Sequence, residues 1–98
     1  MAVGEEIKIG SEIEYLKTAA VFENVGKRQQ AHKIHEMVIN RWPESFMARV
    51  GLGNILYSEG KYAQALEQFK IAHKLEPENN DIQNNIEVAK KALRTAAP

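Results

Sequence analysis

The chain has 98 residues, and 13 basic side chains balance 13 acidic ones, so the formal net charge is zero. This length fits one domain, and the charge balance argues against a nucleic-acid binder, which normally carries a basic face. The absence of cysteine excludes disulfides, thiolate nucleophiles and cysteine-ligated zinc. No apolar run is long enough to span a bilayer, and the acidic start does not resemble a signal peptide. We therefore expect a cytoplasmic protein that binds no nucleic acid and does not insert into a membrane.

Apolar residues that recur at spacings of three and four predict five helices. In chain order, we expect them at residues 12–24, 27–41, 45–58, 62–75 and 81–94. Ser11 to Glu14 has the pattern of a capping box, which predicts that the first helix starts at Glu12. Residues 1–11 and 95–98 lack a helical pattern, and we expect a flexible N-terminal segment and a short tail.

A duplicated unit organises these helices. Three pairs of residues are each 34 positions apart, namely Gly26 and Gly60, Ala31 and Ala65, and Pro43 and Pro77. Glycine at the end of a helix adopts the left-handed conformation without a Cβ clash, and proline cannot donate the backbone bond that would continue a helix. The repeated order predicts two helix hairpins in tandem, at residues 12–45 and 46–79.

The order of these residues resembles the tetratricopeptide repeat (TPR) family, which repeats two antiparallel helices every 34 residues. In the second unit the matching residues are Leu52, Gly53, Gly60, Tyr62, Ala65, Phe69, Ala72 and Pro77. In the looser first unit they are Tyr15, Ala19, Phe22, Gly26, Ala31 and Pro43, and His35 replaces an aromatic residue. The resemblance implies an all-α, right-handed superhelical stack of antiparallel helix hairpins. Gly53 and Ala65 would lie at a close helix crossing, and residues 80–94 would form a capping helix.

The resemblance also implies a function, because the first helix of each hairpin lines the concave side of such a stack. We expect a protein–protein interaction module, an adaptor or scaffold, that binds a peptide or helix of a partner protein in this groove. The expected groove residues are Ile13, Leu16, Ala20, Glu23, Asn24, Met47, Val50, Asn54, Tyr57, Ser58, Asn84, Val88 and Lys91. Leu16 and Val50 fit a core position equally well.

Two further expectations concern the partner. Some members of the family bind acidic chaperone tails, but Leu16, Ala20 and Gly51 occupy places where that clamp needs polar or basic groups. A stack usually needs about three repeats for stability, so two repeats and a cap are close to the lower limit. The alternative function is therefore self-association, or a fragment of a longer array that mediates homo-oligomer assembly, with the first helix as the docking edge.

The sequence offers no complete catalytic or metal-binding set. His32 and His35 share a helix face near Glu36, but a metal site needs further ligands, and we expect His35 to be a partly buried structural residue. There is no phosphate-binding glycine loop and no serine elbow. We expect Trp42 to pack over a hairpin end. The sequence thus predicts a protein that is not an enzyme and that has no cofactor or metal.

Overall fold

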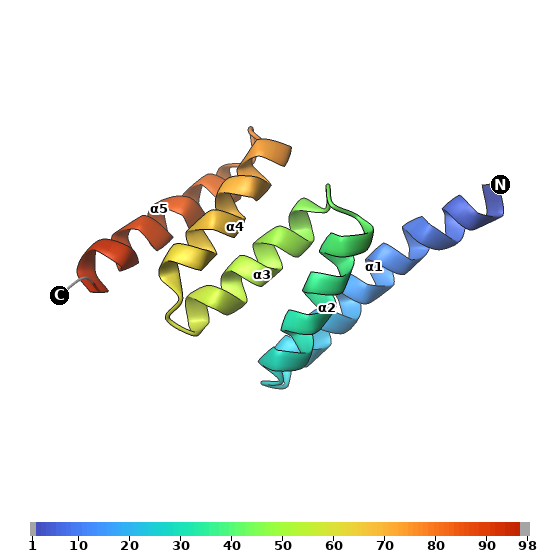
Figure 1. Ribbon diagram of the computed structural model, residues 1–98, viewed down its shortest axis with the longest axis horizontal. Helices are drawn as coiled ribbons and strands as arrows, with labels where there is room; N and C mark the ends of the chain where they lie inside the picture. The colour runs from blue at the N-terminus through green and yellow to red at the C-terminus, as the bar shows by residue number, and fades with distance from the viewer. Residues whose placement is uncertain (1, 97–98) are drawn as a thin grey trace. The chain divides into compact units, whose positions relative to one another are not determined.

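The computed structural model describes the backbone of residues 2–96 and the side chains of residues 12–96. This described part forms five helices, which are α1 (Ala2–Asn24), α2 (Arg28–Arg41), α3 (Phe46–Ser58), α4 (Tyr62–Leu75) and α5 (Asn80–Ala96) (Figure 1). The chain divides into two compact units, Met1–Pro43 with α1 and α2, and Glu44–Pro98 with α3, α4 and α5. The all-α, helix-hairpin class that the sequence predicts is confirmed.

The outer ends of the fold differ from the sequence prediction. Helix α1 begins at Ala2 rather than at Glu12, so the capping-box pattern at Ser11 lies inside a helix. No proline lies before Ser11 to stop the helix. An internal glycine lowers the stability of a helix by only about 1 kcal/mol relative to alanine. Helix α5 includes the first half of the expected tail, through Ala96. Met1, residues 97–98 and the side chains of the predicted flexible segment lie outside the described residues.

The ends of α1 and α3 confirm the predicted glycine caps. Gly26 and Gly60 have φ angles of 81° and 80°, in the left-handed region that favours glycine. In both turns the following lysine donates its backbone N–H to a carbonyl of the last helical turn, at 2.8 and 2.9 Å. Pro43 and Pro77 each lie just beyond the end of a helix. The repeated residues therefore mark the turns as expected.

The first unit is a hairpin of α1 and α2. Its fully buried small residues, Ala19 on α1 and Ala31 on α2, have no exposed surface. At the open end of the hairpin, Tyr15 and Trp42 bring their ring centroids to 6.1 Å. The Arg41 guanidinium lies 5.3 Å from the centre of the Trp42 ring, a favourable cation–π distance. Trp42 thus packs on the hairpin, as predicted.

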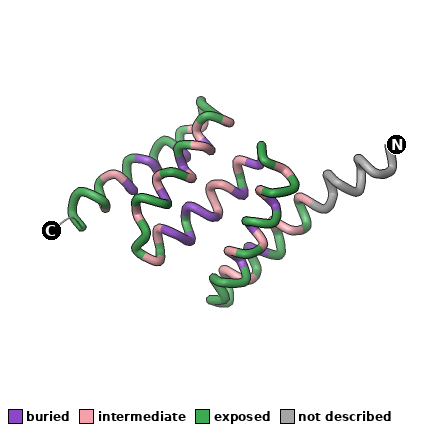
Figure 2. The backbone as a smooth tube through the Cα atoms, viewed as in Figure 1, coloured by how far each residue is buried: buried purple, intermediate pink, exposed green. Residues whose placement is uncertain are grey.

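The second unit is centred on the crossing of α3 and α4. A Cβ atom placed on Gly53 would lie 2.5 Å from the Phe69 ring, so only glycine allows this approach. Ala65 and Ala72 on α4 are completely buried, and Figure 2 shows the buried segments of these helices in purple. Helix α5 packs against α4 and buries Ile82, Ile86 and Ala89. The predicted close crossing at Gly53 and Ala65 agrees with this packing.

Side-chain caps begin two of these helices. The Ser45 hydroxyl accepts a hydrogen bond from the Ala48 backbone N–H at the start of α3. The Asn79 side-chain oxygen accepts from the backbone N–H groups of Asp81 and Ile82 at the start of α5, at 3.0 and 3.2 Å. Over the residues described, no helix combines the length and apolar character needed to cross a membrane.

Candidate functional site

Helix α3 has one buried face and is exposed along the opposite strip. Its buried residues are Ala48, Leu52, Gly53, Ile55 and Leu56. The strip consists of Met47, Val50, Asn54 and Tyr57, which follow one another at spacings of three and four and so share a face. Met47 is 57% exposed and Asn54 is also exposed, whereas Val50 and Tyr57 are half-buried. The structure thus brings these four predicted residues together as the α3 strip.

Tyr57 is held at the end of the α3 strip by a second aromatic ring. Its ring centroid lies 5.1 Å from that of Tyr62, the first residue of α4, and the two planes are inclined by 59°. Such tilted pairs are a favourable arrangement of aromatic rings. Ser58, which the sequence also placed in the groove, donates its hydroxyl to the Ile55 carbonyl at 2.7 Å. The Tyr57 ring is therefore preoriented, whereas the Ser58 hydroxyl bonds to its own helix.

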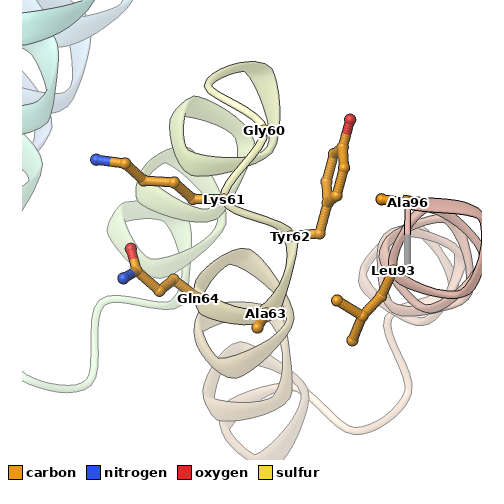
Figure 3. A pocket seen from close by; sticks show the side chains of 7 residues that line it. All are labelled: Gly60, Lys61, Tyr62, Ala63, Gln64, Leu93 and Ala96. Atoms are coloured by element: carbon orange, nitrogen blue, oxygen red, sulfur yellow. The ribbon is translucent and has the colours of Figure 1, made fainter. Parts of the chain in front are cut away.

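A cavity of about 430 Å³ lies on the other side of Tyr62, between the start of α4 and the end of α5. Figure 3 shows Tyr62 and Ala63 facing Leu93 and Ala96 across this space, with Lys61 and Gln64 at its edge. The sequence analysis did not predict this cavity. Leu93 is 39% exposed, because it lies beyond the last α5 residue that α4 buries.

The three groove residues expected on α5 are all exposed. Asn84, Val88 and Lys91 are spaced by four and three residues, so they share a face. The buried residues Ile82 and Ile86 lie on the opposite face, which packs against α4. These three side chains are therefore solvent-facing, on the side of α5 that points away from α4.

The groove residues expected on α1 also form one strip of the first unit. Ile13, Leu16, Ala20, Glu23 and Asn24 recur at helical spacing, and none of them is buried. Ile13 is 51% exposed, Ala20 and Asn24 are exposed, and Leu16 and Glu23 are half-buried. Leu16, like Val50 on α3, thus lies between the core and the surface. We call these five residues the α1 strip.

Glu23 differs from the other members of the α1 strip because it has a partner in the same hairpin. Its Oε2 lies 3.2 Å from Nε2 of His35 on α2. The His35 side chain is only 5% exposed, whereas that of Glu23 is 33% exposed. The structural role expected for His35 is confirmed, and its burial is more complete than the sequence indicated. The contact also assigns Glu23 a role that the sequence alone did not indicate.

The other histidine on α2 has a different partner. His32 Nε2 lies 3.4 Å from Glu36 Oε2, one helical turn further along. The two histidines therefore point to separate carboxylates, although they are three residues apart. Within the described residues, no three histidine, aspartate or glutamate side chains lie close enough together to hold a metal ion.

Two exposed apolar residues near the C-terminal end of α1 were not among the predicted site residues. Val21 and Val25, at the end of α1 and in the turn that follows it, are 59% and 63% exposed. The sequence could have indicated their exposure, because both valines lie off the inward-facing side of α1. Tyr15, Ala19 and Phe22 recur at helical spacing, and neither valine belongs to that series.

In a comparison with known protein families, a TPR repeat model matches residues 53–93 of the chain. The matched range begins at Gly53, contains all of α4 and ends near the end of α5, so it lies within the second unit. It includes the close crossing of Gly53 and Phe69 and all the residues that line the cavity beside Tyr62 except Ala96. The predicted resemblance is confirmed for this part of the chain. No curated protein matches the chain.

Proposed function

We propose, from the TPR repeat at residues 53–93 and the protein–protein interaction that such repeats generally mediate, that this chain holds a segment of a partner protein. The α3 strip is the proposed contact surface in the second unit. The observation that carries the proposal is that Met47 and Asn54 are exposed on a helix whose opposite face is buried. Exposed apolar and amide groups on one fixed face suit a peptide or helix with apolar anchors.

The chemistry of the α3 strip supports a polypeptide ligand. Met47 adapts to irregular apolar shapes because its side chain is unbranched and polarisable. Asn54 both donates and accepts, so that it can pair with a backbone amide of the partner. Tyr57 offers a large contact area, and its packing on Tyr62 reduces the rotamer entropy that binding would remove. The cavity beyond Tyr62 has room for one apolar side chain at the end of the bound segment.

The experiment that tests this proposal compares two double variants in a pull-down from the native host, read by mass spectrometry. Asn54→Ala with Tyr57→Ala should lose the captured partner while circular dichroism shows unchanged helicity. The control pair, Glu67→Ala with Lys70→Ala, changes exposed residues of α4 and should retain the partner. Equal capture by both pairs would reject the α3 strip as the contact surface.

A second candidate function is self-association through α1, which rests on the exposure of Ile13, Val21 and Val25. These side chains are 51%, 59% and 63% exposed, and covering apolar surface of this kind lowers the free energy. Sedimentation over a concentration series should then show a dimer that Val21→Glu dissociates. A strict monomer at high concentration counts against this candidate.

Membership in a longer array and the cytoplasmic location remain predictions.

A further inference from the structure

Glu23 carries a negative charge where its own helix does not favour one. It lies in the last turn of α1, which contains no basic residue. The C-terminus of a helix is the negative end of its dipole, so a carboxylate there is electrostatically unfavourable. The Glu23 carboxylate thus adds a full negative charge at the negative end of the α1 dipole. A cation supplied from outside the hairpin would complement both charges.

Buried His35 fixes the position of this carboxylate. An ionised carboxylate only accepts hydrogen bonds, so His35 Nε2 is the donor in the 3.2 Å contact with Glu23 Oε2. The other ring nitrogen, Nδ1, is buried and has no partner within the described part of the chain. The burial of the ring leaves the imidazole little freedom to turn away. Glu23 is therefore held in one orientation before any ligand arrives, which reduces the entropy that binding removes.

The surroundings of Glu23 define the kind of side chain that fits. A carboxylate has about four lone-pair sites, and 33% of this side chain is exposed, so that it can accept further hydrogen bonds. Ala20 and Leu16 lie one and two helical turns earlier on the same strip, and they offer apolar surface to a hydrocarbon stem. Arginine combines such a stem with a planar fork of donors that matches a carboxylate.

We infer that Glu23 is a specificity-determining residue that binds an arginine side chain of the partner segment, and that His35 is the residue that positions it. This inference rests on the proposed function, because it names the chemistry of the same partner. The partner segment then presents arginine next to an apolar residue that contacts Ala20 and Leu16 of the α1 strip.

The test is the selection of a phage-displayed random peptide library on the immobilised full chain. Peptides enriched by the unmodified chain should share an arginine beside an apolar residue. A synthetic peptide of that consensus should bind Glu23→Gln about tenfold more weakly, since a charge-assisted hydrogen bond is lost. Glu14→Gln removes the same charge from an exposed position on α1 and should leave the affinity within about threefold. Replacing the arginine of the peptide by citrulline should reproduce the loss with the unmodified chain.

Two variants of His35 test the positioning role. His35→Gln keeps a donor near the place of Nε2 and should retain the arginine preference, whereas His35→Phe removes the donor and should behave like Glu23→Gln. Thermal melts followed by circular dichroism identify a variant that fails to fold. If His35→Phe does not fold, the positioning role is tested by comparing the peptide affinities of His35→Gln and Glu23→Gln. An arginine preference that survives in folded His35→Phe overturns the positioning role.

The outcomes separate this inference from the proposed function. If the unmodified chain enriches no peptide, both the proposed function and the inference fail. If it enriches peptides without a basic residue, or if Glu23→Gln selects the same arginine consensus, the inference is wrong while peptide binding stands. A consensus with lysine in place of arginine, and equal affinity for both, contradicts the recognition of a planar guanidinium.

Discussion

The ring of Phe69 occupies the space into which a side chain at Gly53 would project. A Cβ atom built on Gly53 lies 2.5 Å from Cε1 and 2.8 Å from Cδ1 of that ring, and Phe69 is 2% exposed. The ring is enclosed in the core, so it cannot move aside into solvent. The close approach of α3 and α4 in the second unit thus depends on the absence of a Cβ atom at residue 53.

Gly53→Ala should therefore destabilise the chain although alanine is the better helix former. The gain in helix propensity is about 1 kcal/mol, whereas overpacking of a core costs about 1–3 kcal/mol. We expect a net loss in the free energy of unfolding, measured by urea denaturation. Combining Gly53→Ala with Phe69→Leu should cost less than the sum of the two single changes. If the two changes in the free energy of unfolding were strictly additive, the Phe69 ring would not be what obstructs a Cβ atom at residue 53.

Gly60→Ala tests the left-handed turn between α3 and α4. At a φ of 80° an alanine is strained by about 1–2 kcal/mol. No atom lies within 4 Å of the added Cβ, so the cost arises from the backbone alone. Gly60→Asn should lose less stability, because asparagine tolerates this conformation better. Thermal denaturation measures both, and an alanine variant as stable as the unmodified chain would exclude a left-handed residue 60.

Ala65→Leu tests the packing of α4. Ala65 is completely buried, and the added atoms have to displace neighbours at a cost of about 1–3 kcal/mol. Glu67→Leu places a leucine at an exposed position on the same helix, away from the cavity, and should change stability by less than about 0.5 kcal/mol. An unchanged melting temperature for Ala65→Leu would mean that Ala65 is not at a close crossing.

Asn79→Ala tests the start of α5. The variant loses the oxygen that accepts from Asp81 and Ile82, and N-cap removal typically costs about 1 kcal/mol. We expect faster amide hydrogen exchange in the first turn of α5, with little change in α3. Asn80→Ala, at an exposed neighbouring position, is the control. Equal exchange in both variants would reject Asn79 as the cap.

The candidate site was predictable in part. Helical periodicity places Met47, Asn54 and Tyr57 on one face of a helix, and the structure shows that this face is accessible. Periodicity did not reveal that Tyr57 packs on Tyr62, or that Leu93 borders a cavity, because each contact joins residues of different helices. Likewise, the spacing of His32 and His35 indicated a shared face, whereas the structure gives the two histidines separate carboxylates.

The sequence by itself determined the local features of this protein. Glycine, proline and the spacing of apolar residues act through the backbone of neighbouring positions, so the number of helices, their turns and the hairpin repeat follow from order alone. Tertiary structure decided the features that depend on distant residues. Gly53 accepts the Phe69 ring, and His35 fixes Glu23 across the hairpin. Such contacts depend on side chains that only folding brings together, and no local pattern records which partner each one finds.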